Sequence, residues 1–196
     1  MEYVTYSRKA GAAIGQMIVT GFGTLWMISW CLQQRGVDAA TLMLIALAGA
    51  AIFLAAWSQF RAGRRQPDTR EEKAVYKARG RGFLWVNVAQ WLALFASGPC
   101  LAWLGHSNWG EALGIMIVGV HFVPLARLFR TRQHYLTGLA LILVALAYPW
   151  LGDGTVNYAL GGFATGSVLW ISALVTFYRL GDRGSLAPPN TDGLVI

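Results

Sequence analysis

Four polar side chains lie within long apolar stretches of this chain, and they are the first candidates for chemistry. They are Gln16, Asn87, Gln90 and His121. Asn87 and Gln90 are three residues apart, so they face the same side of a helix. Amides both donate and accept hydrogen bonds, and an imidazole can change its charge near neutral pH. Because such groups need partners or water inside hydrocarbon, the sequence predicts a converging polar cluster.

The segment from His121 to Phe129 is the most distinctive local motif. Pro124 lacks a backbone N–H and clashes with the carbonyl of Val120, so we expect a helix kink beside His121. Arg127 lies one turn further on, where it can extend to the membrane interface or pair inside a bundle. We therefore add Pro124 and Arg127 to the candidate site residues.

This polar layer has two interpretations. In the first, it lines a hydrated cavity or binding site that opens toward the cytoplasm, as in a transporter, channel or binding protein for a small molecule. In the second, the side chains satisfy one another and hold helices together. The middle of each span lacks Asp, Glu, Lys and Arg, which argues against ion-coupled transport.

The elements that carry these residues are six apolar stretches. Hydrophobic residues make up 56% of the 196 residues and charged residues 13%, a composition typical of membrane proteins. Each stretch approaches the length of about 20 residues that crosses a bilayer as a helix. We predict an all-α bundle of six transmembrane helices, a polytopic membrane protein with one domain over 1–180. The predicted spans are 11–32, 39–60, 83–104, 111–129, 136–151 and 158–178.

The basic residues predict the orientation. Of sixteen Lys and Arg residues, fifteen lie in alternate gaps between spans, and Arg35 alone lies on the other side. Because basic residues favour the cytoplasmic side, both termini are predicted to be cytoplasmic. We expect a multi-pass protein of the cell membrane, namely the bacterial cytoplasmic membrane. Residues 61–82 form a basic cytoplasmic loop with a short surface helix over 69–78, and 181–196 form a disordered tail.

The net charge of +7 then has a membrane explanation. The basic side chains adjoin apolar spans, where they meet anionic lipid headgroups, and no nucleic-acid partner is expected. The basic loop also supports an alternative function, that of a non-transporting membrane scaffold or accessory subunit that binds a partner through 61–82.

Small residues and aromatic residues fit the same arrangement. Gly11 with Gly15, and Gly162 with Gly166, have the spacing that lets helices approach closely. We interpret them as packing within one chain, with homodimerisation as the lesser option. Four tryptophans form an outer aromatic belt: Trp30, Trp103, Trp109 and Trp150. Glu111 fits the role of a charge at the start of the fourth span.

The remaining reactive residues do not form a recognised catalytic set. Cys31 and Cys100 both fall near the outer side, where either a disulfide or two reduced thiols would fit. His106, His121 and His134 are predicted outside, within and inside the membrane, so we expect no metal site. Nucleophile-elbow, zinc-protease and phosphate-loop motifs are absent from the sequence, so neither an enzyme nor a cofactor is predicted.

From Gly82 to Tyr148 the chain resembles an uncharacterised family of small bacterial six-helix membrane proteins. The resemblance is carried by His121, Phe122 and Pro124, which match a His-Phe-x-Pro motif in the fourth span. It implies the six-helix fold and no particular biochemical activity.

Overall fold

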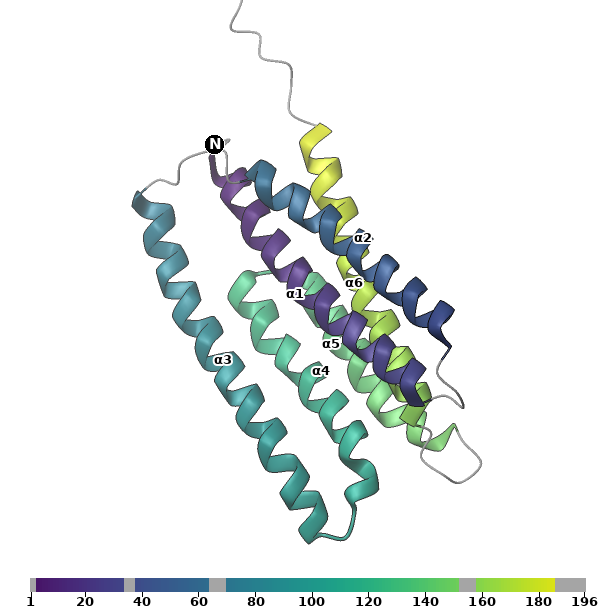
Figure 1. Ribbon diagram of the computed structural model, residues 1–196. Helices are drawn as coiled ribbons and strands as arrows, with labels where there is room; N and C mark the ends of the chain where they lie inside the picture. The colour runs from purple at the N-terminus through teal and green to yellow at the C-terminus, as the bar shows by residue number, and fades with distance from the viewer. Residues whose placement is uncertain (1–2, 34–37, 64–69, 152–157, 186–196) are drawn as a thin grey trace, which may run out of the picture.

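The computed structural model describes residues 3–33, 38–63, 70–151 and 158–185 (Figure 1). These ranges are almost entirely helical and contain no strand, which confirms the all-α prediction for them. The elements are α1 (Tyr3–Gln33), α2 (Ala39–Gly63), α3 (Arg70–Trp103), α4 (Gly110–Phe129), α5 (Arg132–Ala147) and α6 (Tyr158–Ser185), with short 3₁₀ helices η1 (Ser107–Trp109) and η2 (Tyr148–Trp150).

Five of these helices are long and apolar enough to cross a membrane: α1, α2, α3, α4 and α6. Their outer surfaces agree with that composition. In α3, none of the residues from Gly80 to Trp103 is buried, and Trp85, Trp91 and Phe95 are all exposed. Apolar surface this extensive is unusual on a protein in water. The helices are therefore consistent with an integral membrane protein.

Helix boundaries differ from the predicted ones at the basic loop and the tail. Residues 70–78, predicted as a separate surface helix, are the first turns of α3, which continues without a break into the apolar segment. Extending a helix is cheaper than nucleating a second one, and residues 70–82 contain no proline. Residues 181–185 continue α6 instead of starting a disordered tail. Residues 64–69 and 186–196 lie outside the described part.

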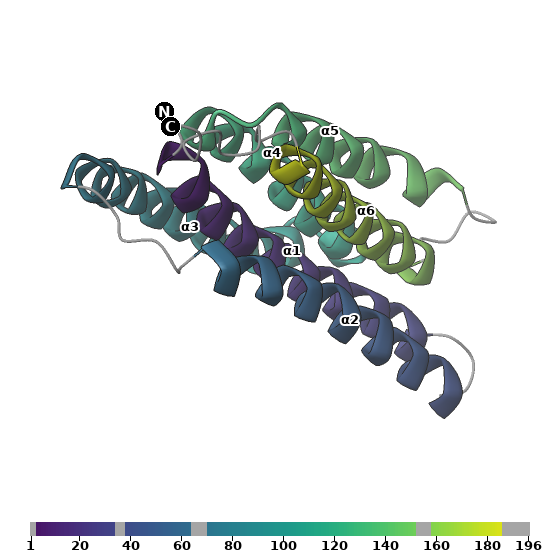
Figure 2. The same ribbon diagram turned by 90° about the horizontal axis from the view of Figure 1, so that it is seen from above.

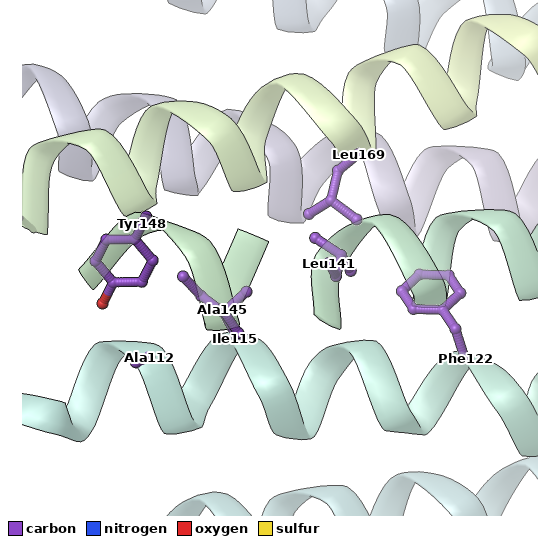
Figure 3. Close-up of a cluster of buried hydrophobic side chains, with 7 residues drawn as sticks. All are labelled: Ala112, Ile115, Phe122, Leu141, Ala145, Tyr148 and Leu169. Atoms are coloured by element: carbon purple, nitrogen blue, oxygen red, sulfur yellow. The ribbon is translucent and has the colours of Figure 1, made fainter. Parts of the chain in front are cut away.

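Helices that are distant in sequence lie side by side (Figures 1 and 2). α1 packs against α2 and α6, α4 packs against α3 and α5, and α5 contacts α6. The main apolar core lies between α4, α5 and α6 (Figure 3). Its buried residues are Ala112, Ile115, Phe122, Leu141, Ala145, Tyr148 and Leu169. α2 and α3 each cover one side of the bundle and leave their outer faces exposed.

Glycines allow the closest helix crossings. A Cβ atom on Gly138 would lie 2.7 Å from the carbonyl oxygen of Gly119, so α4 and α5 touch through their backbones. Gly166 lies equally close to α1, where its Cβ would meet the Met27 side chain at 2.7 Å. The predicted packing role is thus seen for Gly162 and Gly166. It is wrong for Gly15, because nothing lies within 4 Å of its Cβ position.

Candidate functional site

Gln16 and Thr20 form the most unusual polar group in the described part of the chain. They are four residues apart on α1, and their exposed fractions are 3% and 1%. Neither amide atom of Gln16 has a hydrogen-bond partner among the described residues, and nor does the Thr20 hydroxyl. Burying an unpaired polar group costs about 1–3 kcal/mol. The described residues therefore supply no hydrogen-bond partner for these three buried atoms.

The contacts of α1 show where this pair lies. Gly23 packs against Leu169 and Trp170 of α6, and the Trp170 indole N–H donates to the Thr24 hydroxyl at 3.2 Å. α1 and α6 run in opposite directions, so moving along α1 from Gly23 to Gln16 moves along α6 from about Leu169 to Thr176. We infer that Gln16 and Thr20 face the part of α6 that follows its midpoint.

A second amide belongs to the same end of the bundle. Gln59 of α2 donates through Nε2 to the carbonyl oxygen of Phe177 in α6 at 3.2 Å. Its Oε1 is buried without a partner. Gln59 carries no signal of its own in the sequence, because it lies at the predicted end of a span, where a polar residue is ordinary. Because Phe177 follows Thr176 on α6, we infer that Gln59 lies at about the same depth as Gln16, and we call Gln16, Thr20 and Gln59 the inner amide cluster.

A second polar group, between α5 and α6, is fully bonded. The buried Gln133 donates through Nε2 to the backbone and hydroxyl oxygens of Ser172. The hydroxyls of Thr137 and Ser172 share a hydrogen bond of 2.8 Å. This network fits the interhelical bonding interpretation of the polar layer. Sequence reasoning missed it, because Gln133 follows Arg132 outside the predicted span, whereas hydroxyl residues are common in membrane helices.

The other predicted members of the polar layer lie at a different helix interface from Gln16, the one between α3 and α4. His121 of α4 faces the backbone of Val86 in α3. Asn87 is half-buried and donates to the carbonyl oxygen of Phe83, one turn earlier in its own helix, at 2.8 Å. Gln90 is also partly exposed. The predicted set is thus divided between two helix interfaces, and Gln16 alone is nearly fully buried.

Two histidines that were predicted to be separate lie near each other. The rings of His121 and His134 are 6.2 Å and 5.7 Å from the ring of Phe122. Both Nδ1 atoms are buried and have no hydrogen-bond partner within the described ranges. The close α4–α5 crossing at Gly119 and Gly138 causes this approach, and no sequence spacing reveals it. The described residues contain no group of three His, Cys, Asp or Glu that could hold a metal ion.

The remaining candidates have simpler surroundings. α4 continues through Pro124 to Phe129, and Arg127 is exposed at its last turn. Cys31 is buried against α2, whereas Cys100 is exposed on α3, and both are free thiols, so the structure lacks the disulfide that the sequence allowed. For the basic loop, the structure describes no side chain between residues 64 and 79.

Comparisons with protein-family models, with curated proteins and with solved structures found no match to this chain.

Proposed function

We propose that this protein crosses the membrane six times, with both termini in the cytoplasm, and binds a small uncharged polar molecule in its cytoplasmic half. The function is that of a transporter, channel or binding protein. The carrying observation is the inner amide cluster, in which Gln16 is almost fully buried and neither of its amide atoms has a partner in the described part of the chain. A bound molecule that accepts a hydrogen bond from Nε2 and donates one to Oε1 would remove the free-energy cost of burying these atoms unpaired.

The sixth span in this proposal is α5, which is the shortest helix. Its sixteen residues rise about 24 Å, and the three residues of η2 add about 6 Å. Together they approach the hydrocarbon thickness of about 30 Å. The basic residues at the α2–α3, α4–α5 and C-terminal ends support the cytoplasmic assignment of the ends where α1 begins and α6 finishes.

The chemistry of the cluster favours an uncharged ligand. Gln16, Thr20 and Gln59 offer amide and hydroxyl groups, and none carries a charge. A charged ligand would need a compensating charge in a region of low dielectric constant. Small solutes with several donors and acceptors, such as polyols or ureas, match these groups.

The test is uptake of glycerol and of urea by proteoliposomes that contain the full chain, measured by stopped-flow light scattering. The proposal predicts uptake of at least one solute above that of protein-free liposomes. Gln16→Met keeps the side-chain volume but removes both amide atoms, so it should lower the protein-dependent rate about tenfold or more. Gln90→Met removes an amide from the α3–α4 interface and should change the rate less than about twofold.

Rates for the wild-type protein that equal those of empty liposomes would refute passage of these solutes. Equilibrium binding of radiolabelled glycerol and urea to the same samples then tests binding without passage. If Gln16→Met and Gln90→Met behave alike in both assays, the inner amide cluster is not the site.

A further inference from the structure

A carboxylate and three aromatic rings gather at the opposite end of the bundle from the inner amide cluster. Glu111 lies in the first turn of α4, directly after Trp109, and η2 supplies Tyr148 and Trp150. The rings of Trp109 and Trp150 are 6.0 Å apart and meet edge to face. Figure 3 shows Tyr148 at the end of the apolar core, beside Ala112, the residue after Glu111.

Gly161 of α6 lies next to both the Glu111 carboxylate and the Tyr148 ring. A Cβ atom on Gly161 would lie 3.0 Å from Cε2 and Cζ of Tyr148 and 3.1 Å from Oε1 of Glu111. The Tyr148 ring and the Glu111 carboxylate therefore meet over the same point of α6. Any larger side chain at position 161 would clash with the Tyr148 ring and the Glu111 carboxylate, so both groups depend on glycine here.

Among the described residues, one oxygen of the Glu111 carboxylate has no partner. This oxygen is Oε1, and it is buried. The described segments at this end, 28–33, 38–45, 97–115 and 145–151, contain no Lys or Arg. A buried carboxylate without a partner favours a nearby cation, and a cation placed over an aromatic face gains further attraction.

We propose that Glu111, Trp109, Tyr148 and Trp150 form a binding site for an organic ammonium cation on the outer side of the membrane. Glu111 supplies the negative charge, and the aromatic rings supply cation–π contacts to the methyl or methylene groups around the nitrogen. A metal ion fits less well, because Ca²⁺ and Mg²⁺ take several oxygen ligands, and the described residues contain no group of three His, Cys, Asp or Glu that could hold one. This site is independent of the inner amide cluster.

The test uses the full chain in lipid nanodiscs, with choline as the probe and 3,3-dimethylbutan-1-ol as its uncharged isostere. Binding is followed by tryptophan fluorescence and by saturation-transfer NMR. We expect choline to bind at least about tenfold more tightly than the isostere, and Glu111→Gln to weaken choline binding about tenfold or more. Trp109→Leu should weaken it about 3-fold to 30-fold, the range of a partly desolvated cation–π contact.

Matched controls come from the same side of the membrane. Asp38→Asn removes an exposed carboxylate just before α2. Hydrogen bonds from the Thr41 hydroxyl and from the Ala40 and Thr41 backbone lower the pKa of this carboxyl group. Trp103→Leu removes an indole that is 85% exposed. Each control should change choline affinity less than about twofold, because neither residue touches the site.

Three results would overturn the site: equal affinity for choline and its isostere, equal losses in Glu111→Gln and Asp38→Asn, or no saturable choline binding. If Glu111→Gln does not fold, as judged by size-exclusion chromatography, Trp109→Leu and the isostere comparison decide the question.

Discussion

Two glutamines of this protein are nearly fully buried, and their amides have opposite surroundings. Gln133 bonds to the backbone and hydroxyl of Ser172, whereas neither amide atom of Gln16 finds a partner among the residues that the structure describes. A satisfied buried amide holds helices together, whereas an unsatisfied one costs free energy unless something else occupies its site. The difference between these two residues is the basis for separating structural polar groups from functional ones here.

Replacing each glutamine with methionine should therefore change stability differently. Gln133→Met loses the bonds to Ser172 and should lower the free energy of unfolding by about 1 kcal/mol. Gln16→Met removes unpaired atoms and should leave that free energy unchanged or raise it. Unfolding of the two variants in mixed detergent micelles, followed by circular dichroism, measures both. Equal losses would show that the Gln16 amide is bonded within the protein.

The two thiols differ in exposure and should differ in reactivity. Without any reductant, N-ethylmaleimide should modify Cys100 in the folded protein and leave Cys31 unmodified, because Cys31 is 3% exposed. After denaturation in SDS both should react. Mass spectrometry of the intact chain counts the modified thiols. Two unreactive cysteines that become reactive only after reduction would instead show a disulfide.

At the residue level, the sequence points to polar side chains in an apolar surrounding, but it does not show which neighbours they meet. Gln16 stands out in the sequence, but the division of the layer into two interfaces depends on which helix faces meet. Gln59 and Gln133 lie near helix ends, where polar residues are common and therefore do not indicate a site. His134 comes close to Phe122 only because α4 and α5 cross at two glycines.

At the scale of helices, the α4–α5 crossing fixes the positions of His121 and His134. Gly119 and Gly138 bring the two backbones together, and Phe122 packs beside Gly138 with its Cβ 3.0 Å from the Gly138 Cβ position. Small residues permit this approach, and packing supplies the attraction between helices in lipid. A side chain at either position would separate the helices.

Alanine scanning of two glycines tests this contact. Gly138→Ala would place a Cβ atom 2.7 Å from the Gly119 carbonyl oxygen, and the required shift should cost about 1–3 kcal/mol of stability. Gly15→Ala meets open space and should be neutral or stabilising by up to about 1 kcal/mol, because alanine favours helix. Thermal unfolding in detergent compares them. Equal effects would contradict the close crossing.

Helix identity was predictable from the apolar stretches, and helix boundaries were less so. The ends of α2 and α4 came within a few residues of the predicted spans, since composition changes abruptly there. The start of α3 was missed because its first turns are charged, and charge predicts exposure, not loss of helix. α5 was hard to place since it is short and continues as the 3₁₀ helix η2.

For the whole molecule, the exposed surface and the distribution of charge indicate the same environment. Large apolar side chains cover the outside of α2 and α3. The basic side chains that the structure describes lie toward one end of the helices: Arg61, Arg81, Arg127, Arg130, Arg132 and Arg179. Lipid tails suit the first surface and anionic headgroups suit the second. Fold class followed directly from composition, but the order in which the six helices pack did not, because apolar spans carry little information on their partners.

Single-cysteine labelling tests the proposed orientation. In a background with Cys31→Ser and Cys100→Ser, Ser107→Cys should react with a membrane-impermeant maleimide added outside intact cells. Thr131→Cys, in the short turn between α4 and α5, should react only after the membrane is opened. We expect this turn on the cytoplasmic side, because basic residues beside a span favour that side. The reverse pattern would contradict cytoplasmic termini.

The central claim is that the inner amide cluster holds a molecule other than the protein. A high-resolution density map of the protein in lipid, prepared with and without glycerol, tests this most directly. We predict density within about 2.7–3.2 Å of both Gln16 amide atoms, from ordered water or from glycerol. Gln16 packed dry, or bonded directly to protein groups with no density beside it, would contradict the account.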